Sequence, residues 1–247
     1  MENNGFDRLK RVFAGEVDPM FTGNEPLPLD MMLEDLIKLD DMVWGKYAFS
    51  RDPLRHKFTA IQIEELTRKA NDCGREYAEK VSNEYRTTDP VQIAEKLGLE
   101  IEDPDRPSGI SRITFAEYIE PNHINIYKDT FLKAKSFFED ERIHALLGEN
   151  FDLRNLLIAH ELFHHLEELN KKEIFTRTEK IDLWAIKPFK NRSPINCLGE
   201  IAGMQFAKTL LHLEYSPFVM DVFLVYGYGK EVSSNLYREI MKICMED

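Results

Sequence analysis

The sequence LRNLLIAHELFHH occupies residues 153–165 and directly follows Asp152. Asp is a favoured residue at the position before a helix, because its side chain accepts hydrogen bonds from the free backbone amides of the first turn. The segment contains the pattern His-Glu-x-x-His from His160 to His164. We therefore expect this pattern to lie inside a helix that begins after Asp152.

The spacing of the two histidines suits a metal ion. Residues four apart on a helix lie on one face, with roughly 5–6 Å between their Cβ atoms, so His160 and His164 can reach the same zinc ion. Glu161 lies about 100° around the helix from His160, beside the position of a zinc-bound water. The pattern thus predicts two zinc ligands and a general base, Glu161, that activates the water.

Zinc in hydrolases commonly takes three protein ligands and leaves a fourth position for water, whose pKa falls to about 7. A third ligand is therefore needed from elsewhere. Ser193 and Pro194 precede a largely apolar segment that extends to Leu213, in which Glu200 is the only acid. Burying an unpaired carboxylate costs on the order of several kcal/mol. A buried Glu200 therefore needs a strong partner. We expect Glu200 to be the third zinc ligand.

Simpler roles for these residues stay open. A chain with seven histidines and many acids can contain the pattern by chance, with His160 and His164 as ordinary core or surface residues. Glu200 could be a salt-bridged acid. His165 points about 100° away from His164 and is expected to pack or to face solvent. Cys197 could offer a thiolate to zinc, but a small buried hydrophobe is the simpler interpretation.

Composition excludes several classes of function. The 247 residues are 43% apolar, enough to fill a core, and they carry a net charge of −12. An acidic surface repels phosphate, so we expect no nucleic-acid partner. Three widely spaced cysteines fit a reducing compartment better than a disulfide framework. No signal-peptide core or run of eighteen apolar residues is present, so we expect a cytoplasmic location and no membrane partner.

The remaining sequence predicts a few strands followed by many helices, which is the pattern of an α+β domain. Strands are expected over residues 99–102, 111–119 and 123–127, with a hairpin turn at Pro121 and Asn122. Helices are expected over residues 29–44, 60–85, 89–98, 131–147, 153–170, 194–213, 217–226 and 232–245. We expect residues 1–58 to form an N-terminal helical extension of unknown role and residues 59–247 to form one catalytic domain.

Three blocks within residues 84–213 resemble the ImmA/IrrE family of metallopeptidases. Residues 89–101 are similar to the helix and strand that open the family's domain, and residues 157–165 look like its active helix. Residues 200–211 resemble its glutamate helix, in which an acid precedes a Phe-Ala pair by six residues. Three departures are visible: Phe163 replaces a small residue, Gly203-Met204 replaces Ala-Asn, and His212-Leu213 replaces Met-Pro.

The resemblance implies a zincin-like α+β metallopeptidase domain with a small, mostly antiparallel sheet and a helical C-terminal half. It also implies Zn²⁺ as cofactor and site-specific cleavage of a cytoplasmic protein, such as a transcriptional repressor. Some relatives in that family carry a helix-turn-helix, but the helix at Pro90 is followed by a strand here, so we expect no such unit.

Two questions stay open at this stage. The donor that stabilises the charge developing on the substrate could be Tyr118, Tyr127, Tyr226 or Tyr228, and no spacing argument chooses among them. The rival function is a non-catalytic interaction module, in which the metal site is structural or lost and the acidic surface or residues 1–58 bind a basic partner. Zinc without turnover would favour that rival.

Overall fold

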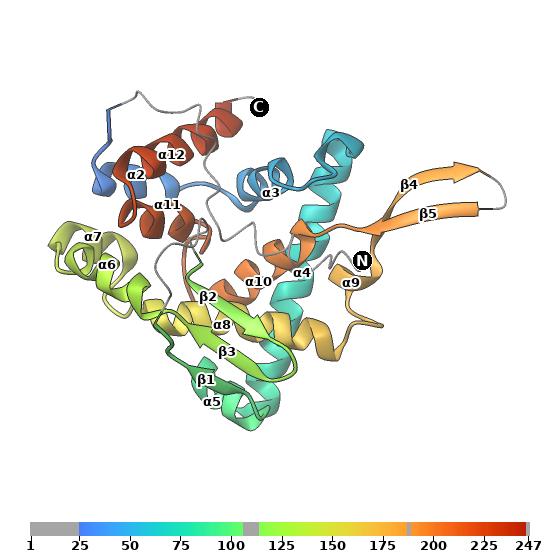
Figure 1. The fold of residues 1–247 in the computed structure, drawn as a ribbon, viewed down its shortest axis with the longest axis horizontal. Helices are drawn as coiled ribbons and strands as arrows, with labels where there is room; N and C mark the ends of the chain where they lie inside the picture. The colour runs from blue at the N-terminus through green and yellow to red at the C-terminus, as the bar shows by residue number, and fades with distance from the viewer. Residues whose placement is uncertain (1–24, 106–113, 187–188, 246–247) are drawn as a thin grey trace.

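The computed structural model describes residues 25–105, 114–186 and 189–245 (Figure 1). These residues form many helices and two small sheets, which confirms the α+β class. Among them, no helix is both long enough and apolar enough to cross a membrane.

Three helices form the centre of the molecule: α4 (Ala60–Tyr85), α8 (Leu153–Leu169) and α10 (Cys197–Leu210). The helix α4 has the predicted bounds, and a capping box of Thr59 and Gln62 fixes its start. It crosses α10 at close range, because a Cβ on Gly74 would lie only 2.2 Å from the carbonyl oxygen of Ala202. Only glycine allows the two backbones to approach this far.

The three-stranded sheet lies against α8 (Figure 1). Its strands are β1 (Glu100–Glu102), β2 (Ala116–Ile119) and β3 (His123–Ile126), in the order β1-β3-β2. The tight turn between β2 and β3 makes that pair antiparallel, as predicted, whereas β1 runs parallel to β3 on its other side. The expectation of a mostly antiparallel sheet is therefore wrong: the sheet is mixed, and β2 forms an edge.

A second, two-stranded sheet was not predicted. The strands β4 (Lys180–Ile186) and β5 (Phe189–Pro194) form an antiparallel hairpin that projects away from the helices (Figure 1). The hairpin follows the one-turn helix α9 (Phe175–Thr178) and leads through Ile195 and Asn196 into α10. The α10 helix therefore begins at Cys197 rather than at the expected Pro194, which ends β5.

Residues 29–50 form two helices rather than the single one expected over residues 29–44. The helix α2 (Leu29–Leu36) ends before Asp40, whose carboxylate accepts hydrogen bonds from the amides of Met42 and Val43 and starts α3 (Asp41–Ser50). The expected stop before Gly45 is wrong, because the helix continues and Gly45 leaves room for the Thr67 side chain. Buried side chains of both helices join the hydrophobic core that α8 and α10 share.

The remaining helices complete the described part of the fold. The helix expected over residues 131–147 is divided at Asp140, which caps the second half through the amides of Arg142 and Ile143. The two halves are α6 (Lys128–Phe138) and α7 (Glu141–Leu147). The other helices are η2 (Arg55–Lys57), α5 (Pro90–Lys96), α11 (Val219–Tyr226) and α12 (Lys230–Met245). The predicted cap of α5 at Asp89 is present.

Candidate metal centre

The helix α8 carries three of the predicted site residues into the interior. Its first turn is capped as expected, because the Asp152 carboxylate accepts a hydrogen bond from the amide of Asn155 at 3.0 Å. His160 is 1% exposed and Glu161 is 5% exposed, and the helix is apolar on most of its other positions. Such burial of polar groups requires partners inside the fold.

The helix α10 carries Glu200, which is 4% exposed. The side chain of Asn196, the residue before the helix, makes no capping hydrogen bond. Instead, Asp52 reaches it from far away in the sequence: its Oδ2 accepts a hydrogen bond from the amide of Cys197 at 3.2 Å, and its Oδ1 accepts one from Leu54 at 2.7 Å. Residue 52 belongs to the segment expected to be an extension, yet it holds the first turn of the helix that bears Glu200.

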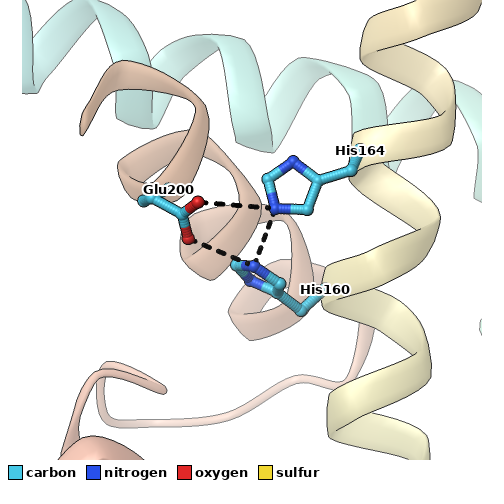
Figure 2. Close-up of side chains that lie close together, drawn as sticks. All are labelled: His160, His164 and Glu200. Carbon is cyan, nitrogen blue, oxygen red and sulfur yellow. Dashed lines mark hydrogen bonds and ion pairs between the residues drawn. The ribbon is translucent and has the colours of Figure 1, made fainter. Parts of the chain in front are cut away.

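The structure brings the three predicted ligands together (Figure 2). The Nε2 atoms of His160 and His164 lie 2.9 Å apart. Oε2 of Glu200 lies 3.4 Å from Nε2 of His160, and Oε1 of Glu200 lies 3.7 Å from Nε2 of His164. The two rings and the carboxylate, from two different helices, therefore point at one shared position.

These separations suit zinc. Ligand atoms about 2.0–2.2 Å from a tetrahedral zinc ion stand about 3.3–3.5 Å from one another. Of the three observed separations, 2.9 Å lies below that range, 3.4 Å lies within it and 3.7 Å lies above it. In addition, Oε2 of Glu200 is buried and has no hydrogen-bond partner among the described residues. A buried oxygen of this kind needs a cation or a proton beside it. The residues present therefore fit a divalent ion.

Charges around the site also point to a cation. The carboxylates of Glu161, Glu167 and Glu200 are buried together, and among the described residues Arg177 is the one Lys or Arg that lines the same cleft. Three buried carboxylates beside a single guanidinium favour a cation between them. Without it, burial raises the pKa of Glu200 to about 7 and also raises that of Glu161.

The two histidines respond differently to the same surroundings. Burial, together with the neighbouring His164, lowers the pKa of His160 to about 3. Burial also acts against the charged form of His164, but the hydrogen bond to Glu167 and the charges of Glu200 and Glu161 outweigh it and raise its pKa to about 9. A proton on His164 can then be donated to Nε2 of His160. In the metal-free protein, this proton supplies part of the positive charge that a metal ion would bring.

Glycines on α10 let the two site helices approach. A Cβ on Gly203 would lie 3.0 Å from Cε1 and 3.1 Å from Nδ1 of His160, and one on Gly199 would lie 2.9 Å from Oε1 of Glu167. Contacts this short are tighter than side chains normally make. Gly203, one of the departures from the family pattern, thus makes room for a ligand ring.

Glu161 lies beside the three ligands and is held by the sheet. Its Oε2 accepts a hydrogen bond from the backbone amide of Tyr118, on the edge strand β2, at 2.7 Å. The Tyr118 hydroxyl donates to the carbonyl of Pro121 at 2.7 Å and lies 3.1 Å from Nδ1 of His165. His165 therefore links α8 to the strand that holds Glu161, which is more specific than the packing role expected for it.

The four tyrosines left open as charge-stabilising donors can now be separated. Only Tyr118 among them lines the cleft next to Glu161. Its hydroxyl donates to the carbonyl of Pro121, and those of Tyr127, Tyr226 and Tyr228 donate to Glu117, to the carbonyl of Leu27 and to Asp129, respectively. Position in the cleft, and not a hydroxyl without a partner, therefore distinguishes Tyr118. Cys197 is buried next to Asp52, and burial raises its thiol pKa well above the ordinary range, which favours the small-hydrophobe interpretation.

Sequence reasoning missed Glu167. This residue is 3% exposed, and its Oε2 lies 3.1 Å from Nδ1 of His164. The Thr176 hydroxyl donates to its Oε1, and Arg177 lies 3.4 Å from its Oε2. Burial alone would raise the pKa of Glu167, but these partners outweigh it and lower the pKa. The spacing of three residues from His164 was the only signal in the sequence.

The site opens into a cleft that is lined by residues of the edge strand β2 and of α8, α9 and α10. Its outer lining includes Glu117, Glu120 and Glu168. Because β2 is an edge strand, an extended peptide segment can pair along this side of the cleft.

Comparisons of the chain with protein-family models, with curated proteins and with solved structures find no match in any of the three. The resemblance to the ImmA/IrrE family therefore stays a prediction. The functional argument depends on the residues of the site itself.

Proposed function

We propose that this chain is a zinc-dependent peptidase that hydrolyses peptide bonds in a cytoplasmic protein. The observation that carries the proposal is the convergence of His160, His164 and Glu200 on one position, with the carboxylate of Glu161 beside it in an open cleft. Zinc bound there would supply a Lewis acid that lowers the pKa of water to about 7 and polarises a peptide carbonyl. Two imidazoles and one carboxylate match the ligand sets of catalytic zinc sites.

The proposal assigns proton transfer to Glu161. Burial raises the pKa of this carboxyl, which brings it closer to neutral pH, where a general base is most effective. The carboxylate accepts a proton from the attacking water and later returns it to the leaving amine. The amide of Tyr118 holds one carboxylate oxygen, so the other stays available for the proton. The β2 strand thereby orients the base relative to the cleft.

The substrate class is proposed on two grounds. The edge strand β2 lines the cleft, and an extended peptide segment can pair with a strand of this kind. The resemblance of residues 84–213 to ImmA/IrrE peptidases favours a transcriptional repressor as the protein that contains this segment. The zincin-like name for the domain is proposed on the same resemblance, together with the contact between the edge strand and the helix that bears the histidines.

The test is proteolysis by the purified chain. Zinc content is measured by elemental analysis, and co-encoded regulatory proteins are incubated with the zinc-loaded chain, with and without a chelator. We expect one zinc per chain and cleavage that the chelator abolishes. Full zinc content without cleavage of any regulator would favour the non-catalytic interaction module.

The substitution Glu161→Gln separates catalysis from metal binding. We expect the variant to keep its zinc and to lose at least about 100-fold in cleavage rate, as is typical when a general base is removed. The change Glu64→Gln removes the same charge from an exposed position on α4, outside the cleft, and serves as the control. A Glu161→Gln variant with undiminished cleavage would remove Glu161 from the mechanism.

A further inference from the structure

Glu167 lies one turn beyond His164 on α8, on the side of the ring away from the proposed metal position. Its Oε2 faces Nδ1 of His164 at 3.1 Å, whereas Nε2 of the same ring faces His160 and Glu200. The two ring nitrogens therefore have separate partners. An imidazole nitrogen that faces a carboxylate carries a proton, which leaves the other nitrogen to offer its lone pair to a metal.

Three helices hold the Glu167 carboxylate in place. Thr176 and Arg177, both on α9, contact its two oxygens, and Gly199 on α10 leaves the space that the carboxylate occupies. A side chain at position 199 would collide with it, since a Cβ there would lie 2.9 Å from Oε1. With its partners on α9 and its neighbour on α10, the carboxylate cannot turn away from the His164 ring.

We infer that Glu167 is a positioning residue of the metal centre, which keeps the His164 proton on Nδ1 and presents Nε2 to the ion. The inference rests on the proposed zinc site. Because metal ligands lose about 10- to 100-fold in affinity when such an outer partner is removed, the contribution of Glu167 is measurable. Thr176 and Arg177 act one step further out, through Glu167.

The experiment measures the zinc dissociation constant of the full chain by competition with a chromogenic chelator. Glu167→Gln keeps an oxygen that can accept from Nδ1 but loses the charge, and Glu167→Leu loses both. We expect affinity to fall in the order wild type, Gln variant, Leu variant, with about a 10- to 100-fold loss for the Leu variant. Glu168→Gln, which removes an equal charge one residue further on, leaves the affinity unchanged.

A merely structural role is tested by two further readouts. Removing one partner of a buried ion pair is destabilising, so we expect the free energy of unfolding to fall in the Leu variant, where Arg177 loses its partner. Glu167→Gln keeps a side chain of the same shape that can accept hydrogen bonds, so we expect its zinc affinity to fall with a smaller change in the free energy of unfolding. Histidine ¹⁵N NMR detects the proton on Nδ1 of His164, which we expect to be protected from solvent exchange in the wild type and not in the Leu variant. If zinc affinity falls only in a Glu167 variant whose free energy of unfolding has fallen to the same extent, the inference is contradicted.

The inference and the proposed function fail in different ways. If the wild type binds zinc and Glu167→Leu binds it equally well, Glu167 has no positioning role, and the metal site stands. If the wild type binds no zinc, both the site and the inference are wrong. If zinc affinity falls more in Glu167→Leu than in Glu167→Gln and is unchanged in Glu168→Gln, the result supports both the metal site and the positioning role of Glu167.

Discussion

The carboxylate of Glu200 and the ring of His160 meet because α10 has no side chain at position 203. The His160 ring occupies the place where a Cβ would be, at 3.0 Å from its Cε1. Protein interiors are packed too densely for such a ring to shift without cost. The geometry of the site therefore depends on a residue that supplies no chemistry itself.

The substitution Gly203→Ala tests this dependence. The added methyl group must displace the His160 ring by a few tenths of an ångström, so we expect zinc affinity to fall by about 10-fold, similar to the loss of an outer partner. The gain from replacing a helical glycine, about 0.5–1 kcal/mol, offsets part of the overpacking cost, so the free energy of unfolding changes little.

The matched control is Gly229→Ala, where the new methyl group would meet only Val232 at an ordinary distance of 3.4 Å. Its zinc affinity should equal that of the wild type. Equal zinc affinity in Gly203→Ala and Gly229→Ala would show that the packing at Gly203 does not control the site.

At this scale, the sequence predicts the ligands but not their supports. His160, Glu161 and His164 lie in one helical turn, so their relation follows from helix geometry alone. Glu200 could be chosen because it is the single acid in an apolar segment. Asp52 could not be chosen, because it contacts α10 only through a fold that brings distant segments together. Glu167 had no signal beyond its spacing of three residues from His164, and nothing in the sequence separated Tyr118 from the other tyrosines.

Helix α10 is an element whose start depends on a distant residue. The carboxylate of Asp52 accepts a hydrogen bond from the amide of Cys197, and this hydrogen bond holds the first turn of α10, in which Glu200 lies. A helix whose free amides lose such a partner frays from that end. The position of Glu200 is therefore coupled to the segment between α3 and α4.

The substitution Asp52→Ala should destabilise the fold by about 0.5–2 kcal/mol, as expected for a lost cap, and should also weaken zinc binding. Urea denaturation and chelator competition measure the two effects. Asp140→Ala removes the cap of α7, which is remote from the site, and should cost similar stability without changing zinc affinity. Loss of stability with unchanged zinc affinity in Asp52→Ala would mean that Glu200 is positioned without this cap.

Element boundaries were predictable where a cap or a turn interrupts the hydrophobic pattern, as at Asp89 and Asp152. They were not predictable at Asp40 and Asp140, because the apolar spacing continues across each break and resembles one longer helix. The β4–β5 hairpin was missed because residues 180–183 and 191–194 are exposed or half-buried, and such positions need no strong hydrophobic alternation. The parallel pairing of β1 depends on strand order, which local sequence does not specify.

The whole molecule shares one core between the expected extension and the catalytic segment. Side chains of α2 and α3 pack with those of α8 and α10, and Tyr47 of α3 donates a hydrogen bond to the buried Asp221 of α11 at 2.8 Å. The described part of residues 1–58 is thus integrated into the fold. A boundary near residue 58 remains a prediction, but separation at that point would expose buried surface on both sides.

Asp221 makes the stability of the molecule depend on pH. Burial raises the pKa of this carboxyl to about 7, well above its value in an unfolded chain. A raised pKa means that the folded state favours the proton, so the associated stability is present at low pH and is lost as pH rises towards and through about 7. The loss is of the order of 2–4 kcal/mol.

The substitution Asp221→Asn removes this titration. We expect the free energy of unfolding of the variant, relative to the wild type, to increase between pH 5 and pH 8. The control is Asp35→Asn. Asp35 accepts a similar hydrogen bond from the Tyr237 hydroxyl, but this pair is only half-buried. A constant difference between the wild type and Asp221→Asn over this range would show that Asp221 does not titrate there.

The most direct test is a crystal structure of the zinc-loaded chain with anomalous diffraction recorded on both sides of the zinc absorption edge. The predicted result is one zinc peak about 2.0–2.2 Å from Nε2 of His160, Nε2 of His164 and a carboxylate oxygen of Glu200. Absence of a peak between these atoms, or a zinc ion bound without Glu200, would contradict the proposed metal centre.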